Sequence, residues 1–260
     1  MDVPLSLLLV TPAAALAGAG LYLLSCQHPR STVWGPAIHR GPADGGRRVA
    51  LTFDDGPTPG TTDAILDELK QFGVKATFFV IGSNAAGHPD LIRRIDREGH
   101  LLGNHSFEHS HFGSFRGDDY WERELRRTSD LIEELVGYRP EYFRPPMGVR
   151  THHISRVAKS NGLTVVTWSR RGIDGLKTTP ARLIRRLAGP TAAGDIVILH
   201  DGVEPNARRT QLATVAAVGP LIQAWRARGL ELVRLDELLA PTKEIPIPAL
   251  ASTPRACSLQ

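Results

Sequence analysis

Short apolar runs alternate with amphipathic segments along most of this sequence, and the alternation limits the folds that the chain can adopt. The runs typical of strands cover residues 48–53, 76–81, 101–103, 142–143, 164–167, 196–199 and 230–234. The segments with apolar residues at helical spacing cover residues 61–72, 89–98, 119–136, 154–160, 180–187, 212–228 and 236–239. About seven strand–helix units of this length predict an α/β fold with a parallel sheet, either open or closed into a barrel.

The composition is that of a globular chain. Of 260 residues, 42% are hydrophobic and 22% are charged, which excludes a mainly disordered, collagen-like or polytopic membrane protein. The net charge of +4 is spread along the chain rather than gathered in a stripe, so we expect no nucleic-acid partner. The cysteines are Cys26 and Cys257, both outside the alternating body, which leaves no CxxC metal site and no internal disulfide framework.

Three segments flank the body, residues 48–240, which we expect to be one domain. Residues 27–47 are rich in Pro, Gly and Arg and are predicted to be a linker. Residues 241–260 are predicted to be a disordered tail that holds Pro241, Pro246, Pro248 and Pro254. Residues 1–26 are predicted to contain a hydrophobic helix.

The N-terminal helix has no charged residue between Val3 and Ser25, and a run of this length can cross a hydrocarbon core about 30 Å thick. A single transmembrane anchor is the first hypothesis for it. A cleaved signal peptide is the second, although the residues before the run lack Lys and Arg. A lipoprotein signal that ends at Cys26 is the third.

Polar residues stand where the predicted strands end. In a parallel α/β barrel, the carboxyl ends of the strands gather at one face, and the active site lies there. After the first strand, Asp54 and Asp55 place two carboxylates side by side, which repel each other unless a cation or a proton lies between them. The alternative is a simple turn, since Asp-Gly-Pro is typical turn chemistry.

Two histidines follow the third strand at a spacing that suits a metal. His105 and His109 are four residues apart, on one face if the segment is helical. Such a pair can hold one metal ion with a carboxylate as the third ligand, although the spacing also occurs without a metal. His111 lies close by, in a position that favours an exposed or outer role.

Two further residues fit the same chemistry. Arg144 lies on a turn fixed by proline, where its guanidinium could hold a carboxylate ionised, or could only cap a helix at the surface. His200 follows an apolar strand and could act as a general acid, or be a structural histidine. The sequence contains no G-x-S-x-G elbow, P-loop or dinucleotide fingerprint after a strand, so interpretations as a serine hydrolase, an NTPase or a dinucleotide enzyme lack their characteristic residues.

Together, five segments resemble the five ordered motifs of the polysaccharide deacetylases, carbohydrate esterase family 4. They are residues 52–57, 105–109, 144–148, 168–174 and 198–200, and the resemblance covers residues 48–239. It implies a distorted (β/α) barrel of about seven parallel strands, and one divalent metal, usually zinc but also cobalt or another ion. It also implies the removal of acetyl groups from N-acetylated sugars.

The resemblance assigns a role to each matching residue. The metal ligands would be Asp55, His105 and His109, and Asp54 would be the general base that activates the attacking water. Arg144 would orient this base, His200 would be the general acid, and Asp174 would tune that histidine. The residues that would contact the substrate are Pro145, Met147, Trp168 and Ile198. Many members have Trp, Leu and an aromatic residue where this chain has Gly175, Ile198 and Met147.

The function that this resemblance implies is N-deacetylation of a glycan. Separately, we expect the protein to be a monomer. The glycan could be peptidoglycan, a chitin-like oligomer, an exopolysaccharide or a lipid-linked sugar. The alternatives are an O-acetyl esterase and a membrane-tethered homologue that only binds carbohydrate. We expect the domain to be membrane-anchored and extracytoplasmic, or secreted if the N-terminal segment is cleaved. The positive-inside rule favours the opposite orientation, because the residues after the segment include Arg30, Arg40, Arg47 and Arg48.

Overall fold

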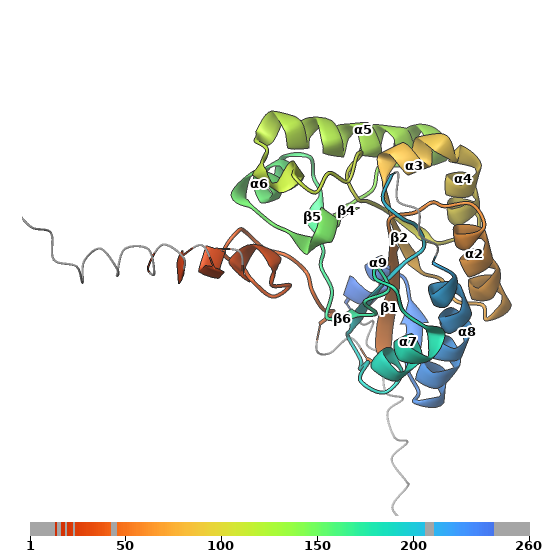
Figure 1. Ribbon diagram of the computed structural model, residues 1–260. Coiled ribbons are helices and arrows are strands. Elements are labelled where there is room, and N and C mark those ends of the chain that lie inside the picture. Colours follow the sequence, from red (N-terminus) through yellow and green to blue (C-terminus); the bar gives the residue numbers. More distant parts are fainter. Residues whose placement is uncertain are drawn as a thin grey trace, which may run out of the picture.

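The computed structural model describes residues 14, 17, 18, 20–22, 24–42, 46–205 and 211–241. Its centre is a curved sheet of parallel strands that forms an open half-barrel (Figure 1). The strand order is β5-β4-β3-β2-β1-β7-β6, and β8 pairs with β1 outside this path. The predicted parallel α/β barrel of about seven strands is therefore confirmed. The strands are β1 Arg48–Asp54, β2 Thr77–Val80, β3 Leu101–Asn104, β4 Tyr142–Phe143, β5 Thr164–Val165, β6 Arg170–Arg171, β7 Ile196–His200 and β8 Glu231–Val233.

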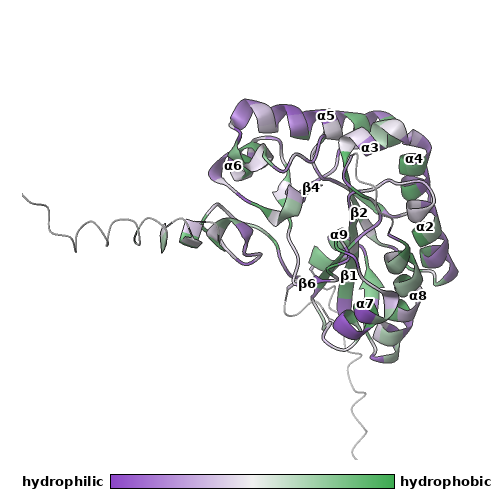
Figure 2. Cartoon of the chain, in the orientation of Figure 1, coloured by the Kyte–Doolittle hydropathy of each residue, from purple (hydrophilic) through white to green (hydrophobic). Residues whose placement is uncertain are grey.

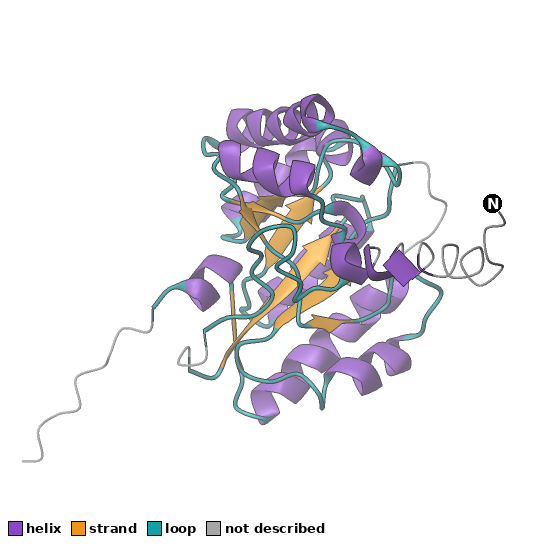
Figure 3. Ribbon diagram, turned by 90° about the vertical axis from the view of Figure 1, so that its left-hand side faces the viewer, coloured by secondary structure: helices purple, strands orange, loops and turns teal. Residues whose placement is uncertain are grey.

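The helices lie around the sheet (Figure 3). They are α2 Thr61–Gln71, α3 Gly82–Gly87, α4 Pro89–Arg97, α5 Asp118–Val136, α6 His152–Ser160, α7 Pro180–Leu187, α8 Leu212–Ala227 and α9 Leu235–Leu239. Two short 3-10 turns cover Gly113–Phe115 and Pro146–Gly148. The sequence pattern predicted all of these helices except α3, and it did not predict β6.

Strand β1 shows how the sheet places polar groups next to a dry core. Side chains alternate between the two faces of a strand. Leu51 and Phe53 face outward and belong to a buried cluster with apolar residues of α2 and α8. Ala50 belongs to a second cluster, with Phe79 and other residues. Thr52 and Asp54 alternate with Leu51 and Phe53 and so share the face of Ala50. Figure 2 shows the apolar character of the central strands, and the mixture of hydrophilic and hydrophobic residues along the helices.

Residues from the predicted linker, 27–47, run along the body of the protein. Ile38 forms a parallel bridge with Val166, directly after β5, and Arg40 forms an antiparallel bridge with Asp195, directly before β7. The buried guanidinium of Arg150 donates hydrogen bonds to the carbonyls of His28 and Ser31, both at 2.7 Å. Part of this segment therefore contacts residues that flank the sheet.

The predicted N-terminal anchor lies largely outside the described residues, and so does the predicted tail after Pro241. Within the part of the chain that the structure describes, residues 24–27 are helical. No helix in that part has the length and apolar character that crossing a bilayer requires.

Candidate active site

The carboxyl ends of β1, β3 and β7 open into one cavity of about 360 Å³. Asp54 ends β1 and pairs in register with His200, which ends β7, while His105 follows directly after β3. The sequence-predicted residues that line the cavity are Asp54, Asp55, His105, His109, Met147, Trp168, Asp174, Ile198 and His200. Arg144 and Pro145 are buried but are not among the lining residues. The structure thus brings most of the predicted site residues together around one cavity.

Backbone strain is concentrated around this cavity. Among the described residues, the non-glycine positions with positive φ are Asp55 (72°), Ser106 (62°), His109 (51°), Met147 (55°) and Ile173 (63°). All but Ser106 line the cavity. A non-glycine residue in this region costs about 1–3 kcal/mol and persists only where its surroundings hold it. The surrounding fold therefore holds the backbone in strained conformations that set the directions of these side chains.

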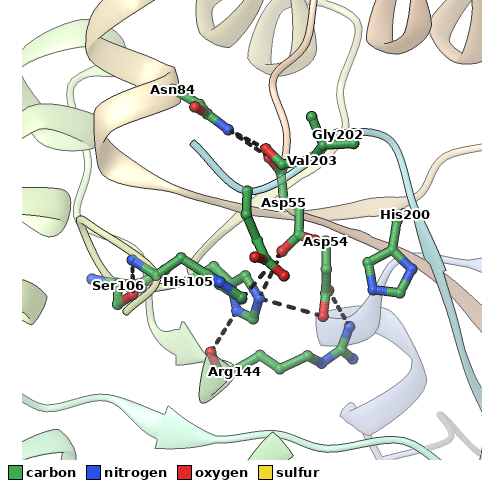
Figure 4. Close-up of polar contacts among 12 residues, drawn as sticks. Asp54, Asp55, Asn84, His105, Ser106, Arg144, His200, Gly202 and Val203 are labelled. Carbon is green, nitrogen blue, oxygen red and sulfur yellow. Dashed lines mark hydrogen bonds and ion pairs between the residues drawn. The ribbon is translucent and has the colours of Figure 1, made fainter. Parts of the chain in front are cut away.

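The contacts around Asp55 show how one of these positions is held. The side-chain amide of Asn84, on α3, donates to the carbonyl of Asp55 at 2.8 Å and to that of Val203 at 3.1 Å (Figure 4). A Cβ on Gly202 would lie 2.3 Å from the same Asp55 oxygen, so only glycine fits there. The loops after β1 and β7 are thereby packed directly on each other.

Asp55, His105 and His109 form a compact buried group. Oδ1 of Asp55 lies 3.3 Å from Nε2 of His105 and 3.4 Å from Nε2 of His109. Nδ1 of His105 lies 2.6 Å from the carbonyl oxygen of Arg144, and an N–H that donates there leaves the Nε2 lone pair facing the group. One ligand atom from each residue falls within 4.8 Å of the others.

The protonation of this group suits a metal. Burial opposes ionisation of Asp55, but the hydrogen bond with His105 and the charges of nearby histidines hold its pKa well below the usual range. Burial lowers the pKa of His109 to about 4, so its imidazole is neutral at pH 7. Burial also acts against the proton on His105, but the charges of Asp54 and Asp55 raise its pKa. Two imidazoles and one carboxylate are a donor set that zinc and similar divalent ions accept. The residues present therefore fit a divalent metal, which would replace the proton on His105.

Arg144 binds Asp54 from inside the barrel. Its Nη1 donates to Oδ1 of Asp54 at 2.6 Å and to the hydroxyl of Thr52 at 2.8 Å, and its Nη2 donates to the carbonyl of Thr167 at 3.1 Å. The guanidinium also lies 4.1 Å from the centre of the Phe79 ring. Oδ2 of Asp54 remains on the side of His105, 3.8 Å from its Nε2. One carboxylate oxygen is thus anchored, and the other lies beside the ligand group.

His200 and Asp174 form a second hydrogen-bonded pair that lines the cavity. Nδ1 of His200 lies 2.9 Å from Oδ1 of Asp174, while Oδ2 accepts from the backbone N–H of His200 and from the hydroxyl of Thr214. Burial acts against the imidazolium, but the Asp174 carboxylate more than offsets it and raises the pKa of His200 to about 9. His200 therefore carries a proton at neutral pH.

Sequence analysis missed several residues near the cavity. Glu204 also lines it, and its Oε2 lies 2.5 Å from Nε2 of His111, whose side chain is 55% exposed. His109, His111 and Glu204 form a second group with metal-ligand spacing. Asp201 is fully buried, and this burial is the main reason that its pKa is raised to about 7. Its carboxyl group accepts a hydrogen bond from the hydroxyl of Thr62. No local pattern marks Glu204, because its partner lies 93 residues away.

Comparison with known proteins agrees with this geometry. Residues 41–166 match the family model described as polysaccharide deacetylase. The chain is 32% identical over 196 residues to a peptidoglycan-N-acetylglucosamine deacetylase of Bacillus cereus, across 75% of this chain and 70% of that protein. The chain belongs to the polysaccharide deacetylase family.

Other deacetylases support the same family assignment. A chitooligosaccharide deacetylase of a Bradyrhizobium species is 34% identical over 204 residues, across 76% of this chain and 93% of that protein. The crystal structure of a peptidoglycan N-acetylglucosamine deacetylase in complex with 4-naphthalen-1-yl-N-oxidanyl-benzamide superposes with a TM-score of 0.73 at 30% identity. The superposed region covers 78% of this chain and 92% of the chain in that crystal structure.

The two groups of possible metal ligands, Asp55–His105–His109 and His109–His111–Glu204, lead to a direct prediction about metal binding. We expect His105→Ala to weaken divalent metal binding by at least about 100-fold, since loss of an outer partner of a ligand alone costs 10–100-fold. The matched variant His111→Ala should keep about one metal per chain after dialysis, measured by atomic emission. Loss of metal in His111→Ala with retention in His105→Ala would place the ion in the second group instead.

Proposed function

We propose that this chain is a metal-dependent N-deacetylase that removes acetyl groups from N-acetylated sugars of a glycan. The observation that carries the proposal is the arrangement of two anchored proton-transfer groups around one cavity. Asp54 is held by Arg144, and His200 is held by Asp174; Asp54 and His200 both line the same cavity as the buried group of Asp55 and its two histidines. The relatives named as peptidoglycan and chitooligosaccharide deacetylases support it.

The metal would be held by Asp55, His105 and His109, and we propose zinc. Three protein ligands of this type leave a position open, as in catalytic zinc sites. A divalent ion held there would act as a Lewis acid toward the acetyl carbonyl and would lower the pKa of water. The remaining chemistry belongs to side chains of the chain itself.

Asp54 has the position of the general base. The Arg144 guanidinium anchors Oδ1 through a charge-assisted hydrogen bond of 2.6 Å. Oδ2, beside His105, is then the atom that accepts a proton from the attacking water. Because Arg144 is fixed by Thr52 and Thr167 as well, the carboxylate stays aimed at the cavity without further reorganisation.

His200 has the position of the general acid. The bond from Nδ1 to Asp174 fixes the ring, and Nε2 is then the atom that gives a proton to the leaving nitrogen. An amine leaves an amide only when it is protonated, whereas an alcohol leaves an ester more readily. A fully anchored acid therefore favours N-deacetylation, and O-deacetylation of an acetyl ester remains the second candidate.

The wall of the cavity suits a small acyl group. Trp168 and Ile198 line it and are 8% and 5% exposed, and Trp168 packs so closely on Gly148 that a Cβ there would lie 2.4 Å from its ring. We propose that these side chains contact the acetyl methyl. The backbone N–H near Met147, at the strained turn, would then stabilise the developing oxyanion.

A role in binding alone accounts poorly for this site. The fully buried Arg144 and the buried Asp54 lose solvation on folding, and such pairs seldom increase stability over apolar residues. Their retention beside an anchored His200 is explained by proton transfer, which a purely carbohydrate-binding homologue does not need.

The general base is tested with Asp54→Asn. We expect acetate release from an N-acetylglucosamine oligomer to fall about 100- to 10,000-fold, because the amide cannot accept the proton. The bound metal should remain, since Asp54 is outside the close ligand group. Asp90→Asn, at a side chain 97% exposed on α4, is the matched control and should keep wild-type activity. An Asp54→Asn enzyme with normal activity would contradict the mechanism.

The general acid is tested through the pH profile. His200 acts in its protonated form, so activity is lost as the pH rises through its pKa, which is about 9. Asp174→Asn removes the charge that raises this pKa, and burial then acts to lower it. The alkaline limb of kcat/KM, measured at saturating metal, should move to lower pH by at least about one unit. An alkaline limb at the same pH in both proteins would exclude His200 as the acid.

A further inference from the structure

A second hollow, of about 390 Å³, adjoins the active-site cavity and is lined by positive charge. Its charged lining residues are all cations: Lys177, Arg182, Arg185 and Arg186. Ile173 and Leu176 line both the hollow and the active-site cavity, so the two spaces share a wall. Helix α7, which carries the three arginines, lies beside β6 at the edge of the sheet (Figure 1) and contains both hydrophilic and hydrophobic residues (Figure 2).

Arg171 connects this hollow to the site. It lines the active-site cavity itself, and its guanidinium lies 5.7 Å from the centre of the Trp168 ring. Its backbone carbonyl accepts a hydrogen bond from Nε of Arg186 at 2.9 Å. None of the proton transfers proposed above uses Arg171. We call Arg171, Lys177, Arg182, Arg185 and Arg186 together the basic groove.

Three arginines elsewhere in the described chain form ion pairs of a kind that the cations of the basic groove lack. Arg94, Arg139 and Arg234 each form ion pairs with two or more carboxylates. No ion pair recorded among the described residues involves a member of the basic groove. On α7, Arg182 is followed at i+3 and i+4 by Arg185 and Arg186, which places the three on one side of the helix. Like charges gathered in this way repel one another and create a local positive potential that attracts anions.

The loop between β6 and α7 holds the basic groove in a fixed place relative to the chemistry. The N–H of Gly172 donates to the carbonyl of Ile198 at 3.1 Å, and Ile173 adopts a strained left-handed conformation. The next residue, Asp174, is bound by His200 and Thr214. The loop that carries the partner of the general acid therefore also forms the wall of the basic groove.

We propose that the basic groove binds an anionic substituent of the glycan, a carboxylate or a phosphate, carried by a sugar next to the one that is deacetylated. This inference rests on the proposed deacetylase function and narrows its substrate class to acidic glycans. A neutral N-acetylglucosamine oligomer would offer no anion to the five cations, none of which has a carboxylate partner among the ion pairs recorded for the described residues. A guanidinium recognises either anion through paired hydrogen bonds.

The experiment compares kcat/KM for matched acetylated oligomers. One is a neutral β-linked N-acetylglucosamine oligomer, and the second carries 3-O-lactyl carboxylates on alternate sugars. In a third the carboxylates are converted to amides, and in a fourth they are replaced by phosphates. We expect the acidic substrates to exceed the neutral and amidated ones by about tenfold at low salt, and the gap to close near 1 M NaCl. The carboxylate and phosphate substrates show which anion is preferred.

Variants test whether the basic groove causes this preference. Arg171→Gln and Arg182→Gln should each lower the ratio of acidic to neutral kcat/KM about threefold, the effect expected for one exposed charge pair. Arg97→Gln, at an exposed arginine on α4 outside the cavities described here, should leave the ratio unchanged. Equal kcat/KM for neutral and acidic substrates in the wild type would overturn the proposal. So would variants that lower both values equally. Absence of acetate release from every substrate would instead contradict the deacetylase function.

Discussion

The buried guanidinium of Arg144 is the interaction on which the rest of the site depends. Its side chain anchors Asp54, and its backbone carbonyl, 2.6 Å from Nδ1, orients His105. One residue thus fixes both the proposed base and a proposed metal ligand. The interior of the half-barrel supplies what a buried charge requires, namely the carboxyl group of Asp54, further hydrogen-bond acceptors and the face of Phe79. Removal of either partner of such a pair typically costs about 3–5 kcal/mol.

The same curvature explains the strained loops. A sheet that curls brings the ends of β1, β3 and β7 close together, and the loops that follow must turn sharply to share one mouth. Asp55 and His109 adopt left-handed conformations there, and close packing on Gly202 and the clamp from Asn84 hold the first of them. The stability of the outer hydrophobic core supports this strain, and the functional groups are in place before substrate arrives.

Local patterns in the sequence were sufficient to predict the parallel sheet, most of the helices and the grouping of polar residues at strand ends. They failed where tertiary contacts decide the structure. Helix α3 has the sequence GSNAAG, without apolar periodicity, and the N–H groups of Gly82 and Ser83 at its start bond to carbonyls after β3. Strand β6 is Arg170–Arg171, two charged residues held by their pairing with β7. Asn84, Thr214 and Glu204 contact the site from distant segments, and no spacing along the chain marks such contacts.

The central claim is that hydrolysis depends on the metal group of Asp55, His105 and His109. The most direct test measures acetate release from an N-acetylglucosamine oligomer by protein stripped of metal with a chelator, and again after titration with Zn²⁺. The account predicts that the stripped protein is inactive and that activity returns in proportion to metal, reaching its maximum at about one ion per chain. Full activity in protein free of divalent metal would contradict it.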